Sequence, residues 1–275
     1  MFLNLFCRQD KGAIPVSDGP LPIRRSFPPI RLTCTLIVRN EVDRVERAIR
    51  SVEGIADEVV VIDSGSTDGT VELCRQLGAR VIFNPWPGFG PQKRFAEDQA
   101  SHDWILNLDA DEWLSDDLRK EIADLFAPPP PPERAFRMRQ TLVYPRRETP
   151  APFASYHNYV RLYNRTTARF RDSLAHDEVV ATSAEIVQLK GAMLHRSYRN
   201  VTHIIVKTLA YYQLQDREKK RLRADRYWRF LFEFPYQFVK YYIFRRHIFG
   251  GADGFVYATA LAMGRWARVF ILMGW

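Results

Sequence analysis

The 275-residue sequence has only three cysteines, Cys7, Cys34 and Cys74, and no CxxC pair. Thiols this few and this scattered exclude a disulfide framework and give no sign of a cysteine-bound zinc or redox site. They favour a reducing compartment. The sequence also lacks a stretch of about 18 residues apolar enough for a confident membrane span, and its first residues lack the continuous apolar core of a secretory signal. We therefore expect a protein that stays in the cytoplasm.

Two common nucleotide-binding motifs are also missing. The sequence has neither the GxGxxG of a dinucleotide-binding turn nor the GxxxxGK[ST] of a P-loop. Their absence weakens a dehydrogenase or an NTPase interpretation.

Positive charge is distributed unevenly along the sequence. The chain carries a formal net charge of +8, and residues 217–247 alone hold ten Lys or Arg against three Asp or Glu. Residues 227–257 also hold 13 of the 36 aromatic residues. Mixed aromatic and basic segments bind at membrane interfaces, so we expect this region to lie on an anionic membrane surface. The alternatives are a helical pair packed on the rest of the protein and an oligomer interface. No recognisable nucleic-acid module accompanies the segment, so a nucleic-acid partner is not expected.

Strand-length apolar runs alternate with helical patterns over the first half of the chain. The expected strands and helices are 32–38, 42–52, 58–63, 71–77, 80–83, 92–100, 104–108 and 116–126. Such alternation predicts an α/β fold with a mainly parallel central sheet. Further strands are expected near 135–144, 157–163 and 186–194, and a helix from about 203 to 222.

These elements suggest three parts of the chain, at 1–30, 31–200 and 201–275. Residues 1–30, rich in proline, are expected to form a loose leader, and residues 31–126 are the first half of the domain at 31–200. The prolines 128–132 form a stiff spacer. The second half of the domain follows at 133–200, and a helical appendage that is aromatic and basic occupies 201–275.

Three carboxylates follow two of the predicted strands. Asp63 ends the second strand, and Asp109 and Asp111 end the fourth. In an extended chain, residues two apart point to the same side, and parallel strands end at the same edge of a sheet, where ligands bind. Paired carboxylates there suit Mg²⁺ or Mn²⁺. The alternative is a surface turn after a buried strand.

The motifs around these carboxylates resemble the three signatures of family 2 glycosyltransferases. They are Leu36–Glu41, Val61–Thr70 and Leu108–Glu112. Two further stretches, Gly88–Arg94 and His195–Tyr198, are similar to the lipopolysaccharide core β-glucosyltransferases of that family. The resemblance covers roughly residues 32–126 and implies an inverting enzyme with the nucleotide-sugar-binding GT-A fold. The GT-A domain would span 31–200, with a nucleotide-binding half at 31–126 and an acceptor half at 133–200.

For the donor, the resemblance implies a UDP-sugar and a divalent cation. Asp63 would bind the uracil or the ribose near the backbone of Val38. Asp109 would contact the ribose and the metal region, and Asp111 would be the main metal ligand. Lys93 or Arg94 would neutralise the diphosphate, unless both lie on a solvated helix face.

For the catalytic base, the best candidates are Asp177 and then Glu178, from the His176-Asp177-Glu178 stretch. A polar turn before a strand is the alternative for this stretch. His195 is a candidate to approach the metal, or is structural. Trp113 stacks on a sugar ring, or belongs to the core.

The resulting hypothesis is a metal-dependent transferase that moves glucose from UDP-glucose to a lipid-anchored inner-core saccharide of lipopolysaccharide. It would work as a peripheral protein on the inner face of the inner membrane. In one rival hypothesis the protein is also a glycosyltransferase, but its acceptor is polyprenyl-linked or an exopolysaccharide. In another, the protein is a non-catalytic membrane scaffold that binds a nucleotide-sugar.

Overall fold

The computed structural model describes residues 31–127, 134–173, 178–181, 185–218 and 226–273. The expected leader at 1–30 and the proline spacer at 128–132 lie outside these residues.

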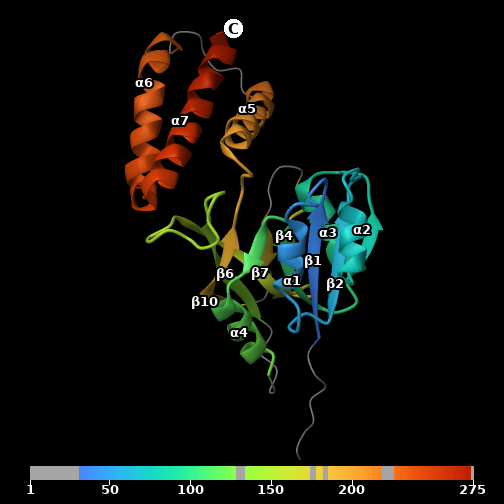
Figure 1. Ribbon diagram of the computed structural model, residues 1–275. Coiled ribbons are helices and arrows are strands. Elements are labelled where there is room, and N and C mark those ends of the chain that lie inside the picture. The colour runs from blue at the N-terminus through green and yellow to red at the C-terminus, as the bar shows by residue number, and fades with distance from the viewer. Residues whose placement is uncertain (1–30, 128–133, 174–177, 182–184, 219–225, 274–275) are drawn as a thin grey trace, which may run out of the picture.

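A central eight-stranded sheet organises the molecule (Figure 1). In sheet order its strands are β3 (Arg80–Phe83), β2 (Glu58–Asp63), β1 (Leu32–Val38), β4 (Trp104–Asp109), β7 (Tyr156–Asn164), β6 (Arg134–Leu142), β10 (Glu185–His195) and β5 (Glu112–Leu114). The first four run parallel, and β6 and β10 are parallel to each other, whereas β7 and β5 are antiparallel to their neighbours. The predicted α/β fold with a mainly parallel sheet is confirmed.

Helices cover both faces of the parallel part of the sheet. They are α1 (Val45–Arg50), α2 (Thr70–Gln76), α3 (Phe89–Gln99) and α4 (Asp116–Leu125). Alternate residues of β2 face opposite layers: Val61 packs in the cluster that contains α1, α2 and α4, while Val60 and Ile62 pack against Ala96 of α3. Because both faces are covered, β1 and β4 read as nearly continuous apolar runs.

Two short strands, β8 (Ala168–Phe170) and β9 (Val179–Ala181), pair in a second small sheet. Strands β5 and β8 were not predicted from the sequence. Both are three residues long, too short for a periodic pattern.

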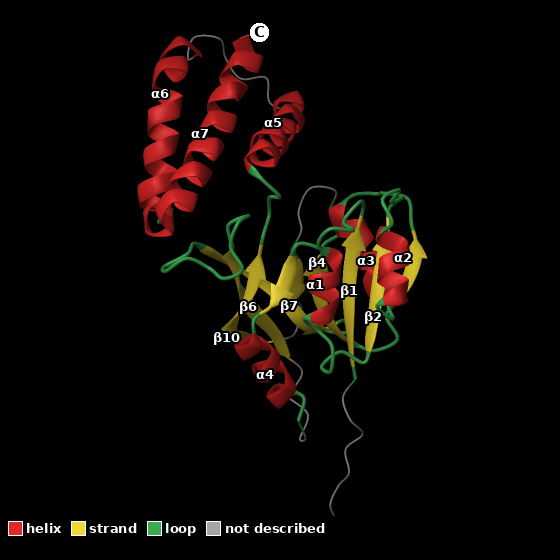
Figure 2. Ribbon diagram, in the orientation of Figure 1, coloured by secondary structure: helices red, strands yellow, loops and turns green. Residues whose placement is uncertain are grey.

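The C-terminal part of the described chain is helical (Figure 2). It consists of α5 (Val201–Glu218), α6 (Arg226–Val239), a π-helical segment η2 (Lys240–Phe244), a 3-10 turn η3 (His247–Gly250) and α7 (Gly251–Met273). Helices α6 and α7 lie side by side, and the indole Nε1 of Trp266 donates to the carbonyl of Phe230 at 2.8 Å. None of the helices in the described ranges combines the length and apolar character needed to cross a membrane.

A separate apolar cluster joins these helices to the sheet. Tyr144, which follows β6, packs with Ile204 of α5 and with Tyr257 and Ala260 of α7. The hydroxyl of Tyr144 also lies 2.8 Å from Nδ1 of His247. The helical part is therefore packed on the rest of the protein, which is one of the alternatives that the sequence left open.

Candidate active site

The carboxyl ends of β1, β2 and β4 meet at one edge of the sheet. The parallel register pairs Val38 with Asp63 on one side of β1, and Ile37 with Asp109 on the other. Asp63 and Asp109 therefore lie on either side of the end of β1, at the same edge of the sheet.

A cavity of about 330 Å³ opens at this edge, and we call it the donor cavity. Its lining residues are Ile37, Val38, Arg39, Glu41, Arg44, Trp86, Phe89, Asp109, Ala110, Asp111, His195 and Lys207. The rings of Trp86 and Phe89 meet edge to face, with centroids 4.9 Å apart. The cavity thus combines aromatic surface with both carboxylates of the Asp109-Ala110-Asp111 motif.

Asp109 is held between two buried cations. Its Oδ1 lies 2.8 Å from Nζ of Lys93, and its Oδ2 lies 3.2 Å from a guanidinium nitrogen of Arg161. Burial favours the protonated form, but Lys93 and Arg161 outweigh it and lower the pKa of Asp109. Asp109 is therefore ionised and charge-balanced before any ligand arrives.

Asp111 faces a different pair of groups. Its Oδ2 lies 3.4 Å from Nε2 of His195 and 3.5 Å from Arg44. Burial raises the pKa of Asp111, but the contact with His195 reverses the shift and lowers it. For His195 itself burial lowers the pKa, and Asp111 outweighs burial and raises it.

Strand β5 explains why His195 reaches this place from far along the chain. It pairs antiparallel with β10 so that Glu112 lies opposite His195, and the amide of Arg196 donates to the carbonyl of Asp111 at 3.0 Å. The fully buried Glu112 then accepts the backbone N–H of Asp109 at 2.9 Å. These bonds fix the turn that carries both aspartates.

The turn after β2 is held by its own aspartate. Oδ2 of Asp63 accepts the amide of Gly65 at 2.9 Å, and Oδ1 accepts the amide of Ser66 at 3.1 Å. The neighbouring Asn40, which has a positive φ of 56°, accepts the amide of Thr67 at 2.8 Å. Asp63 lies beside Val38 but is not among the residues lining the donor cavity, so its role toward a nucleoside remains a prediction.

Neither basic residue predicted to meet the diphosphate lines the donor cavity. Lys93 is fully buried behind Asp109, so the alternative of a solvated helix face is wrong for it. Arg94 donates to the carbonyl of Phe170 at 2.8 Å. The cations that do line the cavity are Arg39, Arg44 and Lys207. None of these three was predicted to meet the diphosphate, although Arg39 lies within the Leu36–Glu41 signature. Arg44, Lys207 and the buried Arg161 belong to no local motif.

Of the remaining predicted residues, neither Trp113 nor Glu178 lines the donor cavity. Trp113 is buried under the guanidinium of Arg47, 3.7 Å from the ring centroid. Glu178 is exposed, with its carboxylate 3.8 Å from Arg171. Asp177 lies outside the described residues. Its role as base, and that of Glu178, remain predictions.

Asp111 and His195 fit a divalent cation whose other ligands come from water and from substrate phosphates. Asp111 and His195 offer one oxygen and one nitrogen within reach of each other. In the described ranges, no group of three or more His, Cys, Asp or Glu could hold a metal by itself. Mg²⁺ commonly takes one or two carboxylates and completes its shell with water and substrate phosphates, and Mn²⁺ also prefers oxygen ligands.

Comparison with known sequences decides the family. Residues 33–184 match glycosyl transferase family 2. The chain belongs to this family. An uncharacterised glycosyltransferase of Rickettsia felis is 36% identical over 250 residues, which are 87% of this chain and 88% of that protein. The lipopolysaccharide core biosynthesis glycosyltransferase LpsC of Rhizobium meliloti is 29% identical over 245 residues, 86% of this chain and 90% of its own length.

Two solved structures align with parts of this family 2 glycosyltransferase. S. aureus TarS aligns with 87% of this chain and 55% of its own, at 13% identity and a TM-score of 0.45. Glucosyl-3-phosphoglycerate synthase from Mycobacterium tuberculosis, solved with Mn²⁺ and UDP, aligns with 42% of this chain and 44% of its own, at 25% identity and a TM-score of 0.33. The family assignment rests on the sequence matches and not on these superpositions.

Proposed function

We propose that this family 2 glycosyltransferase transfers a sugar, most simply glucose, from a UDP-sugar to the inner core of a lipopolysaccharide. The observation that carries the proposal is the donor cavity, where Asp109 and Asp111 face Arg39, Arg44 and Lys207. The similarity to LpsC supports the acceptor class. A polyprenyl-linked or exopolysaccharide acceptor would use the same donor site.

In the proposed reaction, an acceptor hydroxyl attacks the anomeric carbon from the face opposite the diphosphate. The new C–O bond forms as the bond to the diphosphate oxygen breaks, and the hydroxyl proton passes to a carboxylate base, for which Asp177 or Glu178 is the candidate. A Mg²⁺ or Mn²⁺ ion held by Asp111 and His195 would stabilise charge on the departing UDP.

Other side chains of the donor cavity and its surroundings would position the ribose and offset the charge of the diphosphate. Lys93 and Arg161 keep Asp109 ionised and fixed in place, so it can accept hydrogen bonds from the ribose. Arg39, Arg44 and Lys207 would offset the diphosphate charge. Preorganised groups of this kind lower the barrier because they need no rearrangement as charge develops.

Membrane contact is the second part of the proposal. A row of exposed apolar side chains follows α6 and η2 at spacings of three and four residues and is joined by others around η3: Phe232, Tyr236, Val239, Ile243, Phe244, Ile248 and Phe249. Because residues three and four apart share one face of a helix, Phe232, Tyr236, Val239 and Ile243 lie along one face. We call these four side chains, together with Phe244, Ile248 and Phe249, the apolar strip. With Arg246 beside it, the strip suits an anionic bilayer surface, and vesicle binding would test it. We place the protein on the inner face of the inner membrane, where a lipid-anchored acceptor is made.

A nucleotide-sugar screen tests the enzymatic part. Full-length protein would be incubated with Mn²⁺ or Mg²⁺ and a panel of UDP-, GDP-, ADP- and dTDP-sugars, with hydrolysis and thermal stabilisation measured together. We expect both signals with UDP-glucose and a loss of both when EDTA is added. Stabilisation without turnover in the presence of acceptor would favour the non-catalytic scaffold, and no response to any sugar nucleotide would refute the proposal.

A further inference from the structure

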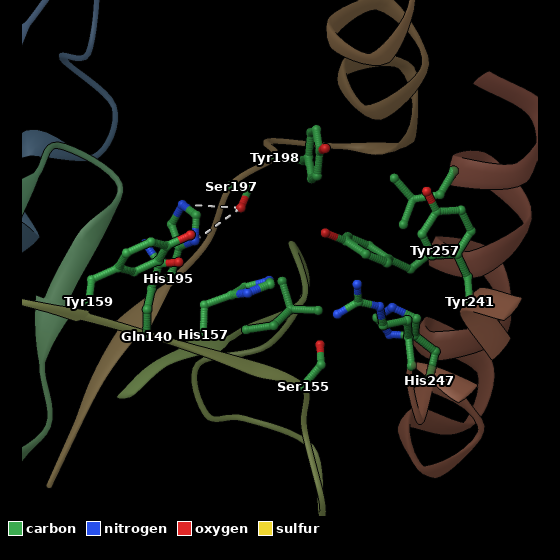
Figure 3. A pocket seen from close by; sticks show the side chains of 13 residues that line it. Gln140, Ser155, His157, Tyr159, His195, Ser197, Tyr198, Tyr241, His247 and Tyr257 are labelled. Carbon is green, nitrogen blue, oxygen red and sulfur yellow. Dashed lines mark hydrogen bonds between the residues drawn. The ribbon is translucent and has the colours of Figure 1, made fainter. Parts of the chain in front are cut away.

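A second cavity, of about 410 Å³, lies between the sheet and the C-terminal helices, and we call it the interface cavity. Gln140, His157 and His195 line it on the side of the sheet, and Tyr241, Arg245 and His247 line it on the side of the C-terminal helices. Figure 3 shows the side chains from the strands facing Tyr241, His247 and Tyr257 across the opening. The volume is within the range of small-molecule sites.

The interface cavity adjoins the donor cavity at one residue. His195 lines both, and its imidazole contacts Asp111 at 3.4 Å. On the wall of the interface cavity, Gln140 donates to Glu112, the carboxylate that fixes the backbone of Asp109. A molecule in the interface cavity would therefore lie next to the place where the donor diphosphate is expected.

The charge in the interface cavity is one-sided. Among its lining residues none is Asp or Glu, and Arg245 makes no ion pair with another described residue. Burial and the charge of Arg245 lower the pKa of His247 to about 4, and the same causes lower that of His157. Both histidines are thus neutral near pH 7, and Arg245 supplies a lasting positive charge.

The other walls suit a saccharide. Tyr159, Tyr198, Tyr241 and Tyr257 combine apolar ring surface with a hydroxyl group, and Ser155 and Gln140 add further polar atoms. Sugar rings present apolar C–H faces as well as hydroxyl groups. Tyrosine, with an apolar body and a polar tip, can meet both.

We propose that the interface cavity is the acceptor site and takes an anionic saccharide, one that bears phosphate or carboxylate groups, with Arg245 as the anion contact. The C-terminal helices are then a wall of the acceptor site and not only a membrane-facing appendage. The inference rests on the proposed function, since it supplies the second substrate of that transfer.

The test compares Arg245→Gln with Arg246→Gln in full-length protein. Arg246 is the adjacent exposed arginine and does not line the interface cavity, so it is a matched control. Calorimetry would measure binding of a deacylated, phosphorylated inner-core oligosaccharide, of the same oligosaccharide after enzymatic dephosphorylation, and of neutral maltoheptaose. Hydrolysis of UDP-sugar without acceptor, measured on the same samples, reports the donor side separately.

We expect the phosphorylated oligosaccharide to bind the parent and the Arg246 variant equally, and the Arg245 variant about 10- to 100-fold more weakly, as for loss of a charge-assisted hydrogen bond. Arg245→Lys should recover part of that loss. If dephosphorylation weakens binding, the contact is a phosphate, and if it does not, the contact is a sugar carboxylate.

Equal binding by the Arg245 variant and the parent, equal binding of maltoheptaose, or no binding to the parent would overturn the inference while UDP-sugar hydrolysis still stands. Absence of UDP-sugar turnover would instead refute the proposed function, whatever the oligosaccharide does.

Discussion

The donor cavity and the interface cavity are neighbours built in different ways. The donor cavity is formed mainly by the ends of β1 and β4 and the short segments that follow them, and ion pairs with Lys93, Arg161 and His195 hold its carboxylates. The interface cavity gathers residues from Gln140 to Leu261, on strands, loops and three helical segments. A site at strand ends inherits its geometry from the sheet, whereas a site between two packed parts depends on how they dock.

Substitutions in the donor cavity should cost more free energy than substitutions in the interface cavity. Removing a charge from the donor cavity leaves oppositely charged partners buried, which is costly. Removing a contact from the interface cavity changes packing or one hydrogen bond, which costs less. Three predictions test this contrast, and a fourth adds the apolar strip as a surface outside both cavities.

The largest effect should follow Asp111→Ala. Losing the proposed metal ligand should lower turnover of the UDP-sugar on the order of 1000-fold, because charge on the departing diphosphate is no longer offset. Steady-state kinetics would measure it. Asp124→Ala, which removes an exposed aspartate of α4, is the control. Unchanged turnover by the Asp111 variant would remove the donor cavity from the chemistry.

Arg161→Met should destabilise the donor cavity itself. Arg161 is 4% exposed and contacts both Asp109 and Glu112. Breaking such a buried pair typically costs about 3–5 kcal/mol in the free energy of unfolding. Urea denaturation would measure it against Arg137→Met, an exposed arginine on β6. A cost within about 1 kcal/mol of that control would mean that water already screens these carboxylates.

The protein should become less stable as the pH falls, because of His247 in the interface cavity. Burial and Arg245 hold its folded pKa to about 4, below the value of about 6.5 in an unfolded chain. The unfolded state therefore binds more protons, and stability that is fully present above about pH 6.5 is lost as the pH falls toward 4, by on the order of 2 kcal/mol. Denaturation at pH 7 and pH 5 would measure it, and His247→Gln should reduce the difference. A pH dependence identical in the variant would assign it to other groups.

The smallest effect concerns the apolar strip outside both cavities. Tyr236→Ser with Phe244→Ser should weaken binding to vesicles with anionic lipid about 10-fold or more, since burying one such ring is worth about 1.5–3 kcal/mol. Phe83→Ser, an exposed phenylalanine on edge strand β3, is the control. Co-sedimentation at low and high salt would measure it.

Surface substitutions are a sharper test of membrane binding than deleting residues 227–275. The deletion would also remove Tyr257 from its packing against Tyr144, and with it one wall of the interface cavity. Vesicle binding undiminished by the double substitution would mean that the strip faces something other than a membrane.

The sequence alone was enough to predict the parallel half of the sheet. The alternating apolar runs predicted β1, β2, β3 and β4 within a residue or two. They also placed Asp63 and Asp109 at strand ends on one edge of the sheet. This works because strand period, turn chemistry and the parallel rule are local properties of the chain.

Tertiary structure decided the partners of those aspartates. Arg161, Arg44 and Lys207 carry no local mark that separates them from the other Lys and Arg residues of the sequence. His195 reaches Asp111 because the three-residue β5 pairs with the end of β10. The interface cavity is the extreme case. Its walls are brought together by packing of Tyr144 against Tyr257 and His247, and a contact across more than a hundred residues leaves no periodic trace in a single sequence.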